Sequence, residues 1–189
     1  SIMDGDSNFT FTNINASHTI VLVVDPASST LFLDDGEGAP STTAHARIDT
    51  YEIVTDKVLV ISGGAAASKT ITGAGIVEVP VDGTYTTTTF GPAVMIQVRD
   101  QSDLTLAAEQ ATGRTITHIG NGPGEVIILE ASPAVIYDFS NIASENIYAT
   151  LRYSAGGTLA DGTGLNWGTI DRVIVEDTFT LTLTAEQAN

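Results

Sequence analysis

Internal repetition constrains this chain more than any other feature of its sequence. Residues 104–112 read LTLAAEQAT, and residues 181–189 repeat them as LTLTAEQAN. Residues 59–72 (LVISGGAAASKTIT) form a weaker copy of residues 104–117 (LTLAAEQATGRTIT). Copies that agree in register over this length predict a single structural unit used several times along the chain.

The local pattern of the chain is that of β-strands. Short runs rich in Val, Ile and Thr are bounded by Gly, Pro, Asn or Asp, which predicts strands at residues 19–24, 58–61, 75–81, 94–98, 126–129 and 173–175. Strict alternation over residues 178–184 predicts a strand that buries Phe179, Leu181 and Leu183 on one face. Helix-like stretches occur at residues 106–111 and 183–188 and are about two turns long at most.

A repeated unit of this kind cannot bury a hydrophobic face alone, but stacked copies form a continuous core. The sequence therefore predicts an all-β, repetitive β-solenoid of the β-helix type. We expect an N-terminal β segment at residues 1–47, followed by a repetitive region at 48–189 with copies beginning near residues 59, 104 and 181. The pair Ile48-Asp49 recurs as Ile170-Asp171, and this match follows the same alignment as the longer copies.

An alternative architecture is a pair of small β-sandwich domains. Their boundary would fall within residues 81–93, where glycines, a threonine run and a Gly-Pro pair interrupt the strand pattern. The last sequence copy stops at Asn189, inside the repeat. We therefore expect the chain to be part of a longer polypeptide.

Composition narrows the classes of function. The 189 residues include 23 acidic and 7 basic side chains, for a formal net charge of -16. This balance argues against nucleic-acid binding, which needs Lys and Arg to displace counterions from phosphate. It also argues against docking on anionic membranes, and no apolar run reaches the ~20 residues of a membrane helix. Cysteine is absent, which excludes disulfides and thiolate chemistry.

Residues 104–151 resemble a known class of repeats. The blocks LTLAAEQA, TIT, GEVIIL, FSNI and ATL are similar to those of very large RTX-type bacterial adhesins and surface-layer-like proteins exported by type I secretion. The resemblance covers roughly residue 48 to the end. It implies an extracellular, cell-surface location and a structural or adhesive role, often with calcium. The acidic glycine nonapeptide that marks the calcium-loaded repeats of that class is absent from this sequence.

Two acidic segments are candidate calcium sites because carboxylate and amide oxygens suit this cation. The first offers oxygen ligands at alternate positions, Asp4, Asp6 and Asn8. It is not an EF-hand, because Phe9 and Asn15 occupy the positions where that loop needs Gly and Glu. The second clusters the carboxylates of Asp34, Asp35 and Glu37. In each case the alternative is an ordinary solvated acidic turn.

Other candidate sites are weaker. Trp167, the sole tryptophan, is either a stacking platform for a sugar or a cap on the core. His18, His45 and His118 lie far apart, which favours structural roles over metal binding. The glycine-rich residues 120–124 lack the Lys and the helix that phosphate binding requires. Paired carboxylates of the kind glycosidases use are unavoidable among 23 acids.

Three hypotheses follow from the sequence. The first is a non-catalytic structural or adhesive module of an extracellular surface assembly: a surface layer, filament or long adhesin. Its partners would be copies of itself, neighbouring repeats of the same polypeptide, or surface glycans. The second is a carbohydrate-binding or carbohydrate-cleaving β-helix, and the third is a viral fibre or tail component. Repetition, acidity and the lack of recognisable catalytic motifs favour the first.

Overall fold

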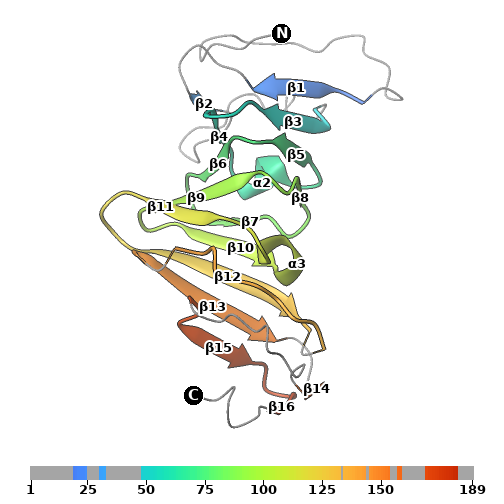
Figure 1. Ribbon diagram of the computed structural model, residues 1–189, viewed down its shortest axis with the longest axis vertical. Coiled ribbons are helices and arrows are strands. Elements are labelled where there is room, and N and C mark those ends of the chain that lie inside the picture. The colour runs from blue at the N-terminus through green and yellow to red at the C-terminus, as the bar shows by residue number, and fades with distance from the viewer. Residues whose placement is uncertain are drawn as a thin grey trace.

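The chain folds into a β-solenoid of about five turns, seen in a computed structural model in which the coils stack along the longest axis of the molecule (Figure 1). The structure describes residues 19–24, 30–32, 48–132, 134–143, 145–153, 157–158 and 169–182. The predicted all-β solenoid is confirmed.

Three parallel sheets run along the solenoid. Sheet A has the order β1 (Val21–Val24), β3 (Thr50–Ile53), β5 (Thr70–Gly73), β8 (Thr89–Phe90). Sheet B has the order β2 (Thr30–Phe32), β4 (Val58–Val60), β6 (Ile76–Val79), β9 (Met95–Arg99), β11 (Ile116–Ile119). Sheet C has the order β7 (Gly83–Thr84), β10 (Asp103–Ala107), β12 (Gly124–Ala131), β13 (Ile147–Tyr153), β15 (Arg172–Val175).

Four short elements complete the described structure. One-turn helices α2 (Gly63–Ala66) and α3 (Ala108–Ala111) each follow a strand of the solenoid. Strands β14 (Gly157–Thr158) and β16 (Leu181–Thr182) pair with each other in a separate parallel ladder. The predicted strands agree in position with β1, β4, β6, β9, β12 and β15.

The core consists of columns of like side chains that run parallel to the solenoid axis. In sheet B, the strand register aligns Leu59, Val77, Ile96 and Ile116, and each of these side chains is fully buried. In-register parallel pairing forces this arrangement, because it places equivalent inward positions of successive coils about 4.8 Å apart. Apolar burial between coils is therefore continuous from one turn to the next.

The two-sandwich alternative is wrong. Strands β6 and β9 pair across the proposed boundary at residues 81–93, and β7, which lies within this segment, pairs with β10 beyond it. Every ladder between named strands is parallel. The glycines and threonines of this segment form corners and the short strands β7 and β8 within continuous sheets, and do not form a linker.

The sequence copies are not whole turns of the solenoid. Most turns take about 20 residues, as the pairing of Thr50 with Thr70 shows, which is a common length for solenoid repeats, but the first takes 29, between Val21 and Thr50. The copies that begin at Leu59 and Leu104 each form a strand, a one-turn helix and a second strand: β4-α2-β5 and β10-α3-β11. The second copy begins two turns and one further sheet along the solenoid from the first. The first strand of the earlier copy, β4, therefore belongs to sheet B, whereas the first strand of the later copy, β10, belongs to sheet C.

The alternating segment near the C-terminus is buried less than predicted. Leu181 packs against the core, as expected. Phe179 is 40% exposed and lies just before β16, so its predicted burial is wrong. Leu183 lies outside the described residues.

Aspartates at the corners tie neighbouring coils together. Asp82 accepts a hydrogen bond from the backbone N–H of Asp103 in the next coil, at 2.9 Å. Asp100 accepts the N–H groups of Asn121 and Gly122, at 3.0 and 2.8 Å. A carboxylate at these points supplies an acceptor to backbone donors that the strand ladder leaves unpaired.

The repeated Ile-Asp pair has one structural role in both of its copies. Asp49 donates its backbone N–H to the carbonyl of Ile20, and its carboxylate accepts the N–H of Ile20 at 2.7 Å. Asp171 makes the same reciprocal pair with Ala149, its carboxylate accepting the N–H at 2.7 Å. The sequence match therefore marks a coil-to-coil clamp at the start of β3 and of β15.

Two buried tyrosines generate a prediction about alkaline stability. The hydroxyls of Tyr51 and Tyr153 are buried and have no hydrogen-bond partner in the described part of the chain. Burial raises the pKa of each to about 12, from an ordinary value of 10.0. The folded state favours the neutral phenol over the phenolate. The stability that this preference contributes is therefore fully present below pH 10 and is lost as the pH rises toward 12.

We expect Tyr51→Phe to unfold at equal or higher urea concentration than the parent at pH 7. Removing a buried hydroxyl without a partner relieves a desolvation cost of about 1–3 kcal/mol. Between about pH 10 and 12 the variant should lose stability less steeply, because one buried phenol no longer ionises. Urea unfolding followed by circular dichroism across this range checks both points. A clear loss of stability at pH 7 would contradict the reasoning.

The corner aspartates predict the behaviour in acid. The backbone N–H of Asn121, with smaller contributions from Gly122 and His118, holds the pKa of Asp100 below its ordinary value of 3.8. Its charged form thus stabilises the fold above about pH 4, and this contribution disappears as the pH falls through the lowered pKa. We expect Asp100→Asn to be less stable at pH 7 and to decline less steeply below pH 4. Asp177→Asn, at an exposed position, is the control and should match the parent.

Candidate functional site

A pocket of about 310 Å³ opens on the outer face of sheet C. It is lined by Glu125, Tyr148, Thr150, Asp171 and Arg172, which come from β12, β13 and the start of β15. Its volume is at the lower end of the range for small-molecule sites. Three successive coils contribute to it, so its shape depends on the solenoid and on no single loop.

Strand alternation and register bring these side chains together. Along β12 and β13 the inward positions are filled by buried apolar residues, so the alternate positions point outward. The register then pairs Glu125 with Tyr148 on neighbouring strands, and Thr150 with Arg172. These outward side chains are adjacent because the strands are parallel and in register.

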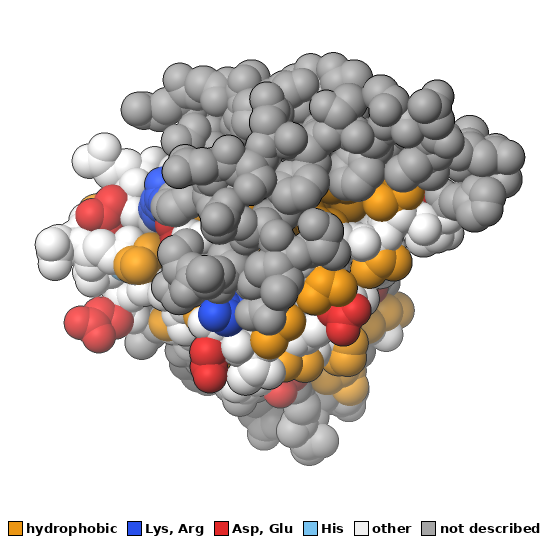
Figure 2. Space-filling view, turned by 90° about the horizontal axis from the view of Figure 1, so that it is seen from above, with side chains coloured by type: hydrophobic (Ala, Val, Ile, Leu, Met, Phe, Trp, Pro, Cys, Tyr) orange, Lys and Arg blue, Asp and Glu red, His pale blue; other side chains and the backbone are white. Residues whose placement is uncertain are grey.

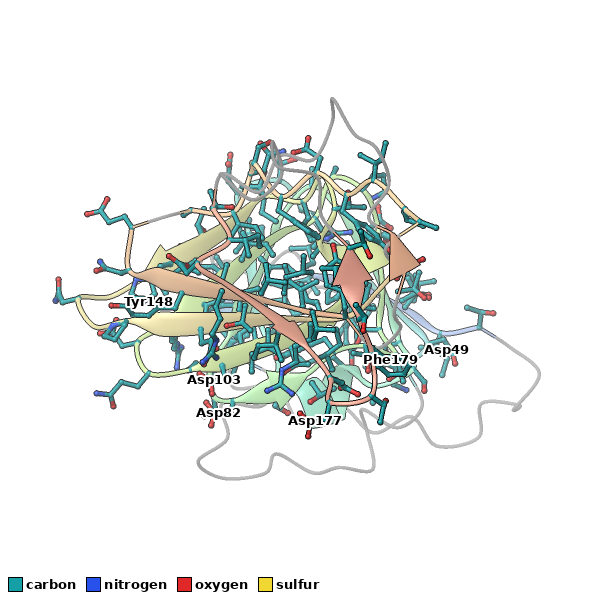
Figure 3. All side chains as sticks on the ribbon, turned by 90° about the horizontal axis from the view of Figure 1, so that it is seen from below. Asp49, Asp82, Asp103, Tyr148, Asp177 and Phe179 are labelled. Atoms are coloured by element: carbon teal, nitrogen blue, oxygen red, sulfur yellow. The ribbon has the colours of Figure 1, made fainter. Side chains whose placement is uncertain are left out.

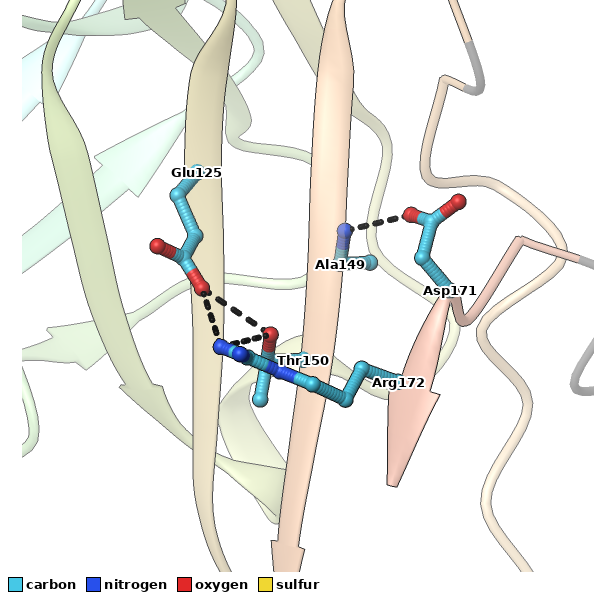
Figure 4. A network of polar contacts seen from close by, with 5 residues as sticks. All are labelled: Glu125, Ala149, Thr150, Asp171 and Arg172. Carbon is cyan, nitrogen blue, oxygen red and sulfur yellow. Dashed lines mark hydrogen bonds and ion pairs between the residues drawn. The ribbon is translucent and has the colours of Figure 1, made fainter. Parts of the chain in front are cut away.

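A polar network fixes the centre of the pocket (Figure 4). Thr150 Oγ1 donates to Glu125 Oε1 at 2.9 Å, and Arg172 Nη2 lies 3.2 Å from the same carboxylate oxygen. Arg172 Nη2 also donates to Thr150 Oγ1 at 3.2 Å. The three side chains therefore hold one another in a single arrangement. Asp171, at the rim, is held by the N–H of Ala149.

Exposure differs sharply among the lining residues. Thr150 is 3% exposed, whereas Tyr148 is 61% exposed. The side chains of Glu125 and Arg172 are 30% and 60% exposed. Viewed from below, Tyr148 lies on the same flank of the molecule as Asp82 and Asp103 (Figure 3).

The surroundings of the pocket are acidic. Two carboxylates, Glu125 and Asp171, face a single guanidinium, Arg172. Asp103 is the register partner of Glu125 on the adjoining strand β10. Burial, together with the charges of Asp82 and Glu125, raises the pKa of Asp103 above its ordinary value of 3.8. The pocket can thus offer hydrogen-bond acceptors and donors, with a net negative charge.

A second pocket, of about 440 Å³, opens at the end of sheet B. It is lined by Glu78, Pro80, Arg99, Asp100 and Ile119. Arg99 forms a close ion pair with Glu78. An aliphatic side chain, Ile119, takes the place that an aromatic ring has in the first pocket. We therefore regard the pocket on sheet C as the better candidate for ligand recognition.

His118 has a structural position, as the sequence favours. Its side chain is 4% exposed, and Nε2 lies 3.1 Å from Asp100 Oδ1. The distance is that of an ion pair, although the angles are not those of a hydrogen bond. The side chain belongs to the same corner that Asp100 stabilises.

The predicted site residues lie outside the described residues. This applies to the candidate calcium ligands Asp4, Asp6, Asn8, Asp34, Asp35 and Glu37, and to Trp167, His18 and His45. Within the described ranges, no group of three or more His, Asp or Glu side chains is placed to hold a metal ion. The calcium sites stay predictions.

The residues of the sheet C pocket were not singled out by the sequence. One signal was available, because the Ile48-Asp49 and Ile170-Asp171 match includes Asp171. Glu125, Tyr148 and Arg172 are far apart along the chain, and the pairing of β12, β13 and β15 brings them together. No local motif specifies that pairing.

Comparison with models of known protein families, with curated proteins and with solved structures found no match. None of the helices in the described part of the chain is long and apolar enough to cross a membrane.

The network in the pocket predicts a measurable coupling. We expect Glu125→Gln and Arg172→Gln each to change stability little, with a coupling energy of about 0.2–1 kcal/mol, because Arg172 is largely exposed. Thr150→Val should weaken that coupling, since its hydroxyl bonds to both partners. A double-mutant cycle by urea unfolding measures these values. Strictly additive effects in the parent background would mean that the network does not hold the side chains in place.

Proposed function

We propose that this chain is a non-catalytic structural or adhesive module of an extracellular bacterial surface assembly, such as a surface layer, a filament or a long adhesin. The observation that carries the proposal is the unbroken parallel stacking of coils. In the part of the chain that the structure describes, sheets B and C each contain five strands, and sheet A contains four. A stack of this kind resists bending and separates whatever is attached to its two ends.

The interior supports this role. Each coil buries its apolar side chains against the coils on either side, and one core cluster extends from Leu22 in β1 to Tyr153 in β13, with Val173 of β15 packed against it. A solenoid of this construction lengthens by adding turns without changing the existing core. Such a module is suited to a long polypeptide made of many similar units.

The ends of the stack support association with neighbouring repeats. Among the described strands, β1 pairs only with β3, and β15 pairs only with β13. An edge strand presents backbone donors and acceptors to which another strand can pair. Further coils of the same polypeptide, or a second copy, are the partners that fit such an edge.

Charge supports a role for cations in assembly. A formal net charge of -16 makes identical chains repel one another. Among the coloured side chains of Figure 2, acidic ones are scattered between apolar ones. In this proposal calcium binds the N-terminal acidic segments, screens the charge and allows copies to associate.

Static light scattering tests the proposal. We expect the average mass to rise to that of dimers or larger species when calcium is added, and to return to the monomer value when a chelator is added. Sodium chloride at equal ionic strength is the control, and it should have a smaller effect if calcium binds specifically. A monomer under all three conditions would contradict calcium-driven assembly.

A matched pair of variants separates binding from general screening. The first neutralises the acidic segment at Asp34, Asp35 and Glu37. The second neutralises three exposed acids elsewhere, Asp56, Glu145 and Asp177, with the same change in net charge. Loss of the calcium response only in the first variant supports a site at residues 34–37. An equal effect of both variants supports charge screening alone.

A further inference from the structure

The pocket on sheet C combines an exposed aromatic ring with fixed polar groups. We infer that it binds one neutral sugar ring of a glycan, with the ring stacked on Tyr148. This inference deepens the proposed adhesive function by naming the class of ligand, and to that extent it rests on it. Five observations support it: ring exposure, polar complement, preorganisation, charge and the contrast with the second pocket.

Tyr148 is unusual among the aromatic side chains of the described residues. Tyr51, Tyr85, Tyr137, Tyr153 and Phe139 are buried and Phe179 is 40% exposed, whereas Tyr148 is 61% exposed. An exposed ring on a rigid strand loses little conformational entropy when a ligand covers it. The face of an aromatic ring is electron-rich and attracts the polarised C–H groups that line one side of a sugar ring.

The polar groups beside Tyr148 match hydroxyl groups. Glu125 uses Oε1 in the network, and Asp171 uses Oδ2 to clamp Ala149. Among the described residues, the second oxygen of each carboxylate is left without a hydrogen bond, and so are Nε and Nη1 of Arg172. Each sugar hydroxyl both donates and accepts. Neighbouring hydroxyls can therefore bond to a carboxylate and to the guanidinium at the same time.

These groups are held in place before any ligand arrives. Thr150 and Glu125 fix Arg172, and the backbone of β13 fixes Asp171. All of them belong to strands or to the residue next to a strand. Side chains that are already ordered lose less entropy on binding, which matters most for a weak ligand such as a single sugar.

Charge selects among polar ligands. The two carboxylates, together with the net charge of the chain, repel anions. The guanidinium of Arg172 already pairs with the carboxylate of Glu125, which lowers the attraction of the pocket for a cation. A neutral polyhydroxylated ring can bond to both groups without a repulsive charge, whereas an acidic sugar is repelled.

The second pocket is a natural comparison. It also has a guanidinium paired with a carboxylate, Arg99 with Glu78, and a second carboxylate, Asp100, so its polar groups are similar to those of the first pocket. It has Ile119 where the first pocket has a tyrosine. We expect it not to bind sugars, and its residues serve as controls.

Saturation-transfer NMR with small probes tests the inference. The probes are methyl glycosides of glucose, galactose, mannose and N-acetylglucosamine at about 20 mM, since one ring is expected to bind in the millimolar range. We expect transfer to at least one neutral probe, strongest at the protons on one side of the ring. The methyl glycoside of glucuronic acid, which adds a negative charge, should show none. No transfer to any of the four neutral probes overturns the inference.

Variants locate the site. Tyr148→Ala should weaken binding by about tenfold or more, whereas Tyr148→Phe, which keeps the ring, should stay within about threefold of the parent. Phe179→Ala removes an exposed ring that lies away from Tyr148 (Figure 3), and it should leave binding unchanged. Arg172→Gln should weaken binding, and Arg99→Gln in the second pocket should not.

Two results would overturn this placement of the site. Binding unaffected by Tyr148→Ala excludes the pocket on sheet C. Loss of binding in Trp167→Ala, with Tyr148→Ala unaffected, assigns the sugar contact to Trp167. Far-UV circular dichroism of each variant confirms that the fold is retained.

The sugar-binding experiment and the calcium-dependent assembly experiment can fail independently of each other. Light scattering of Tyr148→Ala should show the same calcium response as the parent, because Tyr148 lies on β13, an inner strand that already pairs with β12 and β15. Failure of sugar binding with assembly intact leaves the structural role standing. Sugar binding without assembly supports a glycan-binding solenoid and removes the proposed surface assembly.

Discussion

The structure depends on the parallel, in-register pairing of each coil with the next. This pairing satisfies the backbone of inner strands on both sides, and it also stacks equivalent side chains in columns. The buried column of Leu59, Val77, Ile96 and Ile116 follows directly from it. So does the outward arrangement of Glu125, Tyr148 and Thr150, since the same register that orders the core also orders the surface.

The acidic composition of the chain has a structural use at the corners. Asp49, Asp82, Asp100 and Asp171 each accept backbone N–H groups from a neighbouring coil. At Asp100 this bonding requires glycine opposite it. Gly120 adopts a φ of +123°, and a Cβ there would overlap the carboxylate. Part of the net charge therefore belongs to the clamps between coils, and the remainder is available for solubility and for contacts with cations.

Predictions from the sequence succeeded where the signal is local. Short β-branched runs gave strands at the expected places, and the repeated Ile-Asp pair identified two equivalent clamps. They failed where the answer depends on the length of a turn. The copies at Leu59 and Leu104 are real structural units, yet they lie on different sheets because the spacing between them is two turns and one face. Phe179 fits an alternating strand but lies in an exposed segment before β16.

The sequence by itself determined the all-β class and the absence of thiol chemistry from these residues, and it favoured solenoid stacking over two β-sandwich domains. Alternation, β-branching and composition are properties of short segments, and they do not depend on contacts between coils. Only the tertiary structure decided which faces the repeats occupy and which side chains meet in a pocket. The physical reason is that each coil pairs in register with the next although the number of residues between paired positions differs, from 18 between Val58 and Ile76 to 29 between Val21 and Thr50. A one-residue slip in the pairing of β13 would turn Tyr148 to the opposite face of the sheet and away from its present neighbours.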